Sequence, residues 1–237
     1  MKKAAVLIIA FISLSAQFCP AQGSWVNPYT GGVWNNPGSC LLDTMIRNRM
    51  NQQMLEKSIG RRAQSAPTAP RVQRMTYRPA ANLDNAEQLA AALSDAPKDR
   101  QELTGFFREA LEKYRGAAAG AGRSNDLGYA LAFCLGCCYS VANQCDVGDD
   151  ALNGLARQMD AALAEMPALR QCSDLQRQAL AENFAMLGLF VAAGYEQSNA
   201  RPEARAVYVE LARSSFQSLT GLDAGNLTLN SGGMHLR

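Results

Sequence analysis

Residues 130–145 read ALAFCLGCCYSVANQC, a run that carries four cysteines and no charged side chain. The uncharged stretch extends from Leu127 to Ala142 and would be apolar on every side of a helix. A helix of this kind lies either at the centre of a helical protein or in a membrane. Its 16 residues fall short of the about 20 that a membrane span needs. The stretch therefore predicts a buried helix around which the others pack.

Apolar residues recur at three- and four-residue spacing on both sides of this stretch, which is typical of amphipathic helices. The connections between the resulting segments are short, so neighbouring helices should run antiparallel. We predict an all-α domain over residues 83–237, an antiparallel bundle of about five to six helices. The only alternating segment is NLTLN at residues 226–230. The other predicted helices lie near residues 84–93, 103–114, 152–166, 173–191 and 202–219.

The N-terminus has the pattern of a secretory signal peptide. Two lysines precede the uncharged run Ala4–Leu14, and small residues occupy positions 19 and 21. This pattern predicts a signal peptide over residues 1–21, cleaved before Gln22. The short Met-Lys-Lys start is typical of bacteria. We therefore expect a bacterial protein that is periplasmic or secreted, with no transmembrane helix after cleavage.

An aromatic and basic arm, residues 22–82, precedes the predicted bundle. Turn-forming residues and the two tryptophans, Trp25 and Trp34, dominate its first part, where we expect no regular element. Apolar residues from Leu42 to Ile59 then predict one amphipathic helix. Prolines in residues 61–82 indicate an extended linker.

Charge divides the chain into two parts of opposite sign. Residues 22–78 carry eight basic and two acidic side chains, whereas residues 79–237 carry 13 basic and 19 acidic ones. An arm of net +6 beside a domain of net −6 can dock on that domain or reach an anionic surface. We favour docking on the domain, because tethered opposite charges meet at high effective concentration. We expect an unknown protein or envelope partner and no nucleic acid.

The cysteine cluster Cys134–Cys145 admits several chemical interpretations. Cys134 and Cys137 match C-x-x-C, but a redox thiolate needs a helix N-terminus or a basic neighbour, and this pair has neither. A zinc site needs four converging ligands, and the only histidine, His235, lies in the C-terminal tail. We expect Cys134, Cys137 and Cys138 to be small buried hydrophobic residues.

Disulfide pairing of Cys40, Cys145 and Cys172 stays open at this point. A helix over residues 147–165 would place Cys145 and Cys172 at opposite ends of the bundle, too far apart to pair. Cys40 on the arm is the one flexible partner.

Glu182 is the remaining candidate for chemistry, because it lies among apolar residues in LAENFAMLGLF. A buried carboxylate must be paired, hydrogen-bonded or protonated. We expect a structural hydrogen bond to a neighbouring helix or a tyrosine, because one carboxylate alone makes a poor active site. No Ser-His-Asp or Cys-His set can be assembled, and we predict no catalytic, cofactor-binding or metal residue.

Several segments resemble a family of exported bacterial helical proteins known as a domain of unknown function. The likeness covers about residues 76–234 and leaves the arm outside. It implies an all-helical envelope or secreted domain and no catalytic role. The segments are YRPAANLDNAEQLAAAL, NDLGYALAF, QRQALAENFAMLGLFVAAGYEQ and LTGLDAGNLTLNSGGM.

We therefore expect an exported, non-enzymatic helical protein that acts by interaction. The alternative is a thiol- or metal-handling protein or an enzyme that uses the cluster Cys134–Cys145 or Glu182.

Overall fold

The computed structural model describes residues 25–26, 33–34, 74–80, 85–199 and 202–237. The predicted signal peptide, the predicted helix over Leu42–Ile59 and Cys40 lie outside these residues. The predictions made for them remain untested, as does the predicted domain boundary.

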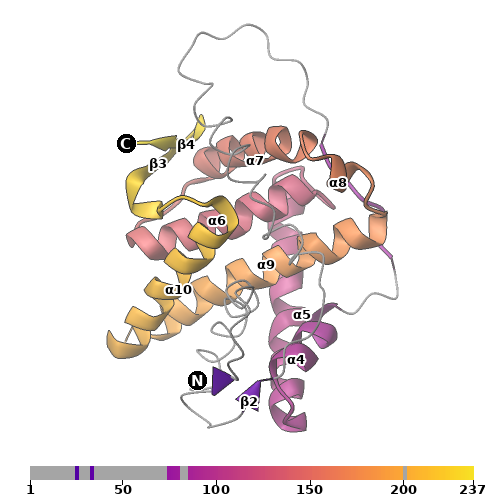
Figure 1. The fold of residues 1–237 in the computed structure, drawn as a ribbon, viewed down its shortest axis with the longest axis vertical. Coiled ribbons are helices and arrows are strands. Elements are labelled where there is room, and N and C mark those ends of the chain that lie inside the picture. Colours follow the sequence, from indigo (N-terminus) through magenta and orange to yellow (C-terminus); the bar gives the residue numbers. More distant parts are fainter. Residues whose placement is uncertain (1–24, 27–32, 35–73, 81–84, 200–201) are drawn as a thin grey trace, which may run out of the picture.

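Seven α-helices follow one another in the described part of the chain, and six of them have nine or more residues (Figure 1). This confirms the predicted all-α fold. The helices are α4 (Asn85–Leu93), α5 (Pro97–Gly120), α6 (Leu127–Asn143), α7 (Asp149–Ala164), α8 (Pro167–Arg170), α9 (Asp174–Gln197) and α10 (Pro202–Thr220).

Local sequence explains where the two central helices begin. The side chain of Asp126 accepts a hydrogen bond from the backbone N–H of Tyr129 and caps α6. Ser173 and Gln176 form a reciprocal capping box at the start of α9. Both arrangements satisfy N–H groups that have no partner inside the helix.

The uncharged helix α6 is central, as predicted, and packs against α7, α9 and α10. Its contact with α9 depends on the absence of a side chain at Gly188. A Cβ atom on Gly188 would lie 2.9 Å from the Cα of Cys134. The two helices can approach this closely only because glycine and cysteine are small.

Helix α5 crosses α9 at a steep angle, so the domain is not a simple up-and-down bundle (Figure 1). The short segment 74–80 is hydrogen-bonded to the residues at the start of α6. The N–H of Leu127 donates to the carbonyl of Met75 at 3.0 Å, and the N–H of Tyr77 donates to the carbonyl of Asn125 at 3.1 Å. Met75 and Tyr77 are buried in the core, although they fall within the predicted linker.

The C-terminal tail forms an antiparallel hairpin of β3 (Leu227–Asn230) and β4 (Gly233–Leu236). β3 coincides with the alternating segment seen in the sequence, whereas β4 lacks that alternation. Gln158 of α7 fixes the hairpin to the helix through two hydrogen bonds of its side-chain amide. The amide oxygen accepts from the N–H of Met234 at 2.8 Å, and the amide nitrogen donates to the carbonyl of Met234 at 3.2 Å. The Gln158 side chain thus makes the two backbone hydrogen bonds that a neighbouring strand would otherwise make with Met234.

The expectation that residues 22–40 contain no regular element is wrong at two positions. β1 (Trp25–Val26) and β2 (Val33–Trp34) pair antiparallel, with Trp25 opposite Trp34. Aromatic and β-branched residues favour strands and stabilise one another across them. Turn-forming neighbours conceal that preference in the sequence.

None of the helices in the described ranges is both long and apolar enough to cross a membrane.

Candidate functional site

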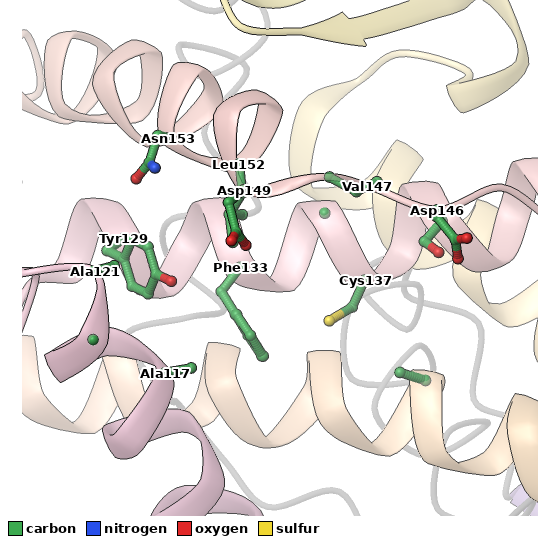
Figure 2. Close-up of a pocket in the computed structure, with 14 residues that line it drawn as sticks. Ala117, Ala121, Tyr129, Phe133, Cys137, Asp146, Val147, Asp149, Leu152 and Asn153 are labelled. Atoms are coloured by element: carbon green, nitrogen blue, oxygen red, sulfur yellow. The ribbon is translucent and has the colours of Figure 1, made fainter.

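A pocket of about 800 Å³ lies where α6 meets the end of α5, the start of α7 and one residue of α9 (Figure 2). This volume falls within the range of small-molecule sites, about 300–1,000 Å³. The lining residues are Ala117, Gly120, Ala121, Tyr129, Phe133, Gly136, Cys137, Ser140, Asp146, Val147, Asp149, Leu152, Asn153 and Ala192.

One side of α6 forms the apolar wall of this pocket. Tyr129, Phe133 and Cys137 are four residues apart, which places their side chains in a row along the helix. Tyr114 of α5 packs behind the two rings. Its centroid lies 6.2 Å from that of Tyr129 and 5.3 Å from that of Phe133. The aromatic wall is therefore supported by core packing and not by solvent-exposed side chains.

Two carboxylates also line the pocket. Asp146 precedes α7 and Asp149 lies in its first turn, where the partial positive charge of the helix end favours an acid. Burial and the nearby carboxylate of Asp149 together raise the pKa of Tyr129, because both disfavour a phenolate. Asp149 and the Tyr129 phenol thus share one space (Figure 2).

Cys134 and Cys138 are completely buried, which confirms that they pack as small hydrophobic residues. A hydrogen bond between the two thiols and their burial raise the pKa of Cys134 well above its usual range. Cys137 differs from this expectation, because it is only half-buried and lines the pocket. Burial nevertheless raises the pKa of the Cys137 thiol well above its usual range, so that it stays protonated at neutral pH.

Cys145 is exposed, Cys172 is half-buried, and both are free thiols. They do not pair with each other, as predicted from the helix that separates them. Over the described ranges, no group of three or more His, Cys, Asp or Glu side chains lies close enough together to hold a metal ion.

Glu182 lies inside the domain, 3% exposed, in a complete hydrogen-bond network. Its carboxylate accepts from Asn85 of α4 at 2.5 Å, from Arg115 of α5 at 2.9 Å and from Gln178 at 3.0 Å. The other end of the Gln178 amide accepts from the N–H of Ala80 at 2.7 Å. This confirms the predicted structural hydrogen bonding. The residue ties α4, α5 and the segment 74–80 to α9 and is not among those that line the pocket.

A second buried ionic cluster was not predicted. Arg123 lies 3.0 Å from an oxygen of Asp126 and 2.8 Å from one of Asp160, and all three side chains are buried. Two carboxylates share one guanidinium here, and burial raises the pKa of Asp160. Gly128 completes the arrangement, because a Cβ there would overlap the Asp160 carboxylate. The sequence feature that could have indicated this cluster is Asp160, a charged residue next to Met159 on the apolar side of α7.

The pocket was not predicted, and Cys137 was considered for chemistry only in the alternative that uses the cluster Cys134–Cys145. Tyr129 and Phe133 read as two more apolar positions in an apolar helix. Asp146 and Asp149 read as ordinary loop and helix-start residues.

Comparison with known proteins identifies the family without identifying an activity. A family described as "Family of unknown function (DUF6683)" matches residues 1–237. The match confirms the resemblance seen in the sequence and extends it to the arm, which the resemblance had left outside. No curated protein and no solved structure matches the chain. The chain belongs to the family of unknown function DUF6683.

Proposed function

We propose that this protein is exported and acts by binding a small molecule in the pocket beside α6, without catalysing a reaction. The observation that carries the proposal is the pocket itself, which has the volume of a ligand site and an aromatic wall. Binding sites of this kind combine apolar surface with a few polar groups that orient the ligand. Tyr129, Asn153 and the two aspartates supply those groups here.

The side chains around the pocket favour binding over catalysis. Cys137 is the only thiol among the described residues that line the pocket, and its raised pKa keeps it protonated. A nucleophilic cysteine needs a base or a cation beside it. Of the described residues that line the pocket, none is a histidine, lysine or arginine. These features count against the alternative of a thiol-handling enzyme.

Glu182 offers no better alternative as a catalytic group. Three side chains donate to its carboxylate, and it lies apart from the pocket lining. A general acid or base must reach a substrate atom directly or through one water. Its contacts support a structural role.

Export rests on the signal-peptide pattern of residues 1–21 and has its own test. The intact mass of the protein isolated from its native host should correspond to a chain that begins at Gln22. A mass that retains residues 1–21 would contradict export by this route.

Binding can be tested by native mass spectrometry with a pair of matched variants. Ala117 and Ala119 are both exposed alanines in the last turns of α5, but only Ala117 lines the pocket. After incubation with a small-molecule extract of the producing cells, the wild-type protein and Ala119→Trp should carry a bound molecule. Ala117→Trp, which places an indole in the pocket, should lose it.

Two results would contradict the proposal. One is a wild-type protein that retains no small molecule from the extract. The other is an adduct that survives in Ala117→Trp with its occupancy unchanged.

A further inference from the structure

The charged side chains among the described residues that line the pocket have one sign. Asp146 and Asp149 both line it, and none of its described lining residues is basic. A third carboxylate, Glu196 of α9, is close enough to contribute to the raised pKa of Cys137. In the described part of the chain, neither Asp146 nor Asp149 forms an ion pair with a basic side chain. Their field therefore acts on whatever enters the pocket.

The apolar wall is suited to the same kind of charge. Aromatic faces carry negative potential and attract cations that lie over them. Tyr129 and Phe133 line the pocket, with ring centroids 6.5 Å apart. Asp149 belongs to α7 and lines the same pocket as these two rings of α6 (Figure 2). A cation between them would meet a carboxylate on one side and aromatic rings on the other.

The Tyr129 hydroxyl adds a specific polar contact. The residue is 97% buried (3% exposed), and its hydroxyl points into the pocket (Figure 2). It forms no hydrogen bond with any residue in the described ranges, whereas the hydroxyl of Tyr139 on the same helix donates to the Leu227 carbonyl at 3.1 Å. The hydroxyl oxygen is accessible from the pocket, because it is not among the fully buried side-chain atoms that lack a partner. A ligand N–H group that enters the pocket can donate to this oxygen.

We infer that the ligand of this pocket is an organic cation, a protonated amine or guanidinium on an apolar or aromatic body. The cationic nitrogen lies between Asp149 and the Tyr129 ring and donates to the Tyr129 hydroxyl. The apolar body lies along Phe133 and Cys137. The volume of about 800 Å³ leaves room for such a body. Anionic ligands are disfavoured, because none of the described residues that line the pocket is a cation that could replace their lost hydration.

This inference rests on the proposed function, since it names the ligand class of the same pocket. Three probes of similar size separate the charge from the apolar body: phenethylammonium, neutral 2-phenylethanol and anionic 3-phenylpropanoate. Their binding to the full chain can be measured by calorimetry and by ligand-observed NMR. We expect phenethylammonium to bind at least about five times more tightly than 2-phenylethanol, as the sum of a cation–π contact and an ion pair. 3-Phenylpropanoate should not bind.

Matched variants localise the effect. Asp149 and Asp150 are adjacent, exposed acids in the first turn of α7, but only Asp149 lines the pocket. Asp149→Asn should weaken phenethylammonium binding about threefold or more, and Asp150→Asn should leave it unchanged. Binding of 2-phenylethanol should be the same in both variants. Tyr129→Phe should also weaken the cation, because it removes the hydroxyl acceptor and keeps the ring.

The inference is overturned if the neutral probe binds as tightly as the cation, if the anion binds best, or if none of the three binds. Equal loss in Asp149→Asn and Asp150→Asn would also overturn it, because the effect would then come from net charge alone. These outcomes are distinct from failure of the proposed function. A cell-derived molecule displaced by Ala117→Trp would uphold binding even where the probes show no preference for a cation.

Discussion

Cys134 and Cys137 lie three residues apart on α6 and both lie close to Gly188, yet only Cys137 also lines the pocket. Cys134 belongs to the closed side of the helix, defined here by Cys134 and Cys138, where α9 approaches until only Gly188 fits. Cys137 belongs to the pocket side, defined by Tyr129, Phe133 and Cys137, where the space in front of the helix is not filled. Two sides of one uncharged helix thus have opposite roles.

Small residues face α6 on both sides, and the two sides differ in the direction of the helix that carries those residues. On the closed side, Gly188 lies in a helix that runs directly against α6, so its missing side chain shortens the distance between the axes. On the pocket side, Ala117, Gly120 and Ala121 lie at the end of α5, which crosses this region (Figure 2). Small side chains at the end of a crossing helix leave a space that nothing closes. Helix direction, more than residue size, decides between a contact and a cavity.

The largest effect is expected from adding a methyl group to the closed side. Gly188→Ala would place Cβ 2.9 Å from the Cα of Cys134, and a backbone atom cannot move aside as a side-chain end can. The free energy of unfolding should fall by about 2–3 kcal/mol. Urea unfolding measures it.

Gly116→Ala is the matched control in α5. A Cβ on Gly116 meets nothing within 4 Å, so the greater helix propensity of alanine should raise stability by up to about 1 kcal/mol. If both substitutions change stability in the same direction, the close approach at Gly188 is not what the closed side depends on.

A smaller effect should distinguish the two cysteines themselves. Cys134→Ser buries a hydroxyl at a position that is 0% exposed, which should cost about 1–2 kcal/mol of stability. Cys137→Ser turns the same group toward the pocket and should stay within about 0.5 kcal/mol of wild type. Thermal or urea unfolding of the two variants gives the comparison directly. Equal losses would mean that Cys137 is as enclosed as Cys134.

Much of the buried interior could be predicted from sequence, and the pocket side could not. An uncharged stretch from Leu127 to Ala142 predicts a central helix, and a carboxylate among apolar residues at Glu182 predicts a buried hydrogen-bond network. Both are local properties. The pocket depends on how the end of α5 and the loop before α7 are placed against α6. The residue pattern within a single segment does not determine these positions.

The cluster of Arg123, Asp126 and Asp160 escaped prediction for a related reason. Asp126 lies at the start of α6, and Asp160 lies 34 positions further along the chain, on α7. Arg123 can pair with both aspartates only when α6 and α7 are packed together.

Thiol reactivity probes the pocket side without a substitution. Burial raises the pKa of Cys137 well above the usual value of 9.0, and burial also raises the pKa of the exposed Cys145, by less. A raised pKa delays thiolate formation, so at neutral pH Cys137 should react with a small neutral maleimide at least about tenfold more slowly than Cys145. Its rate should continue to rise with pH beyond 9.0. Pulse labelling followed by peptide mass spectrometry assigns both rates, and fast labelling of Cys137 at pH 7 would favour the thiol-enzyme alternative.

The smallest effect concerns the phenol that faces the pocket. Burial is the larger cause of the raised pKa of Tyr129 and the Asp149 carboxylate the second, so Asp149→Asn should lower that pKa while leaving it above the usual 10.0. The sign for stability follows from proton binding. The folded chain holds the Tyr129 proton more tightly than the unfolded chain, so stability falls as pH rises past 10.0 and through the raised pKa. Removing the carboxylate should make that fall less steep. NMR titration of ring-labelled tyrosine, with Tyr129→Phe to assign the signal, measures the pKa, and Asp150→Asn controls for net charge at the same helix end. An identical shift in both aspartate variants would mean that the phenol senses the charge of α7 as a whole, and the pocket side would then lack the local acid–aromatic pairing that sets it apart from the closed side.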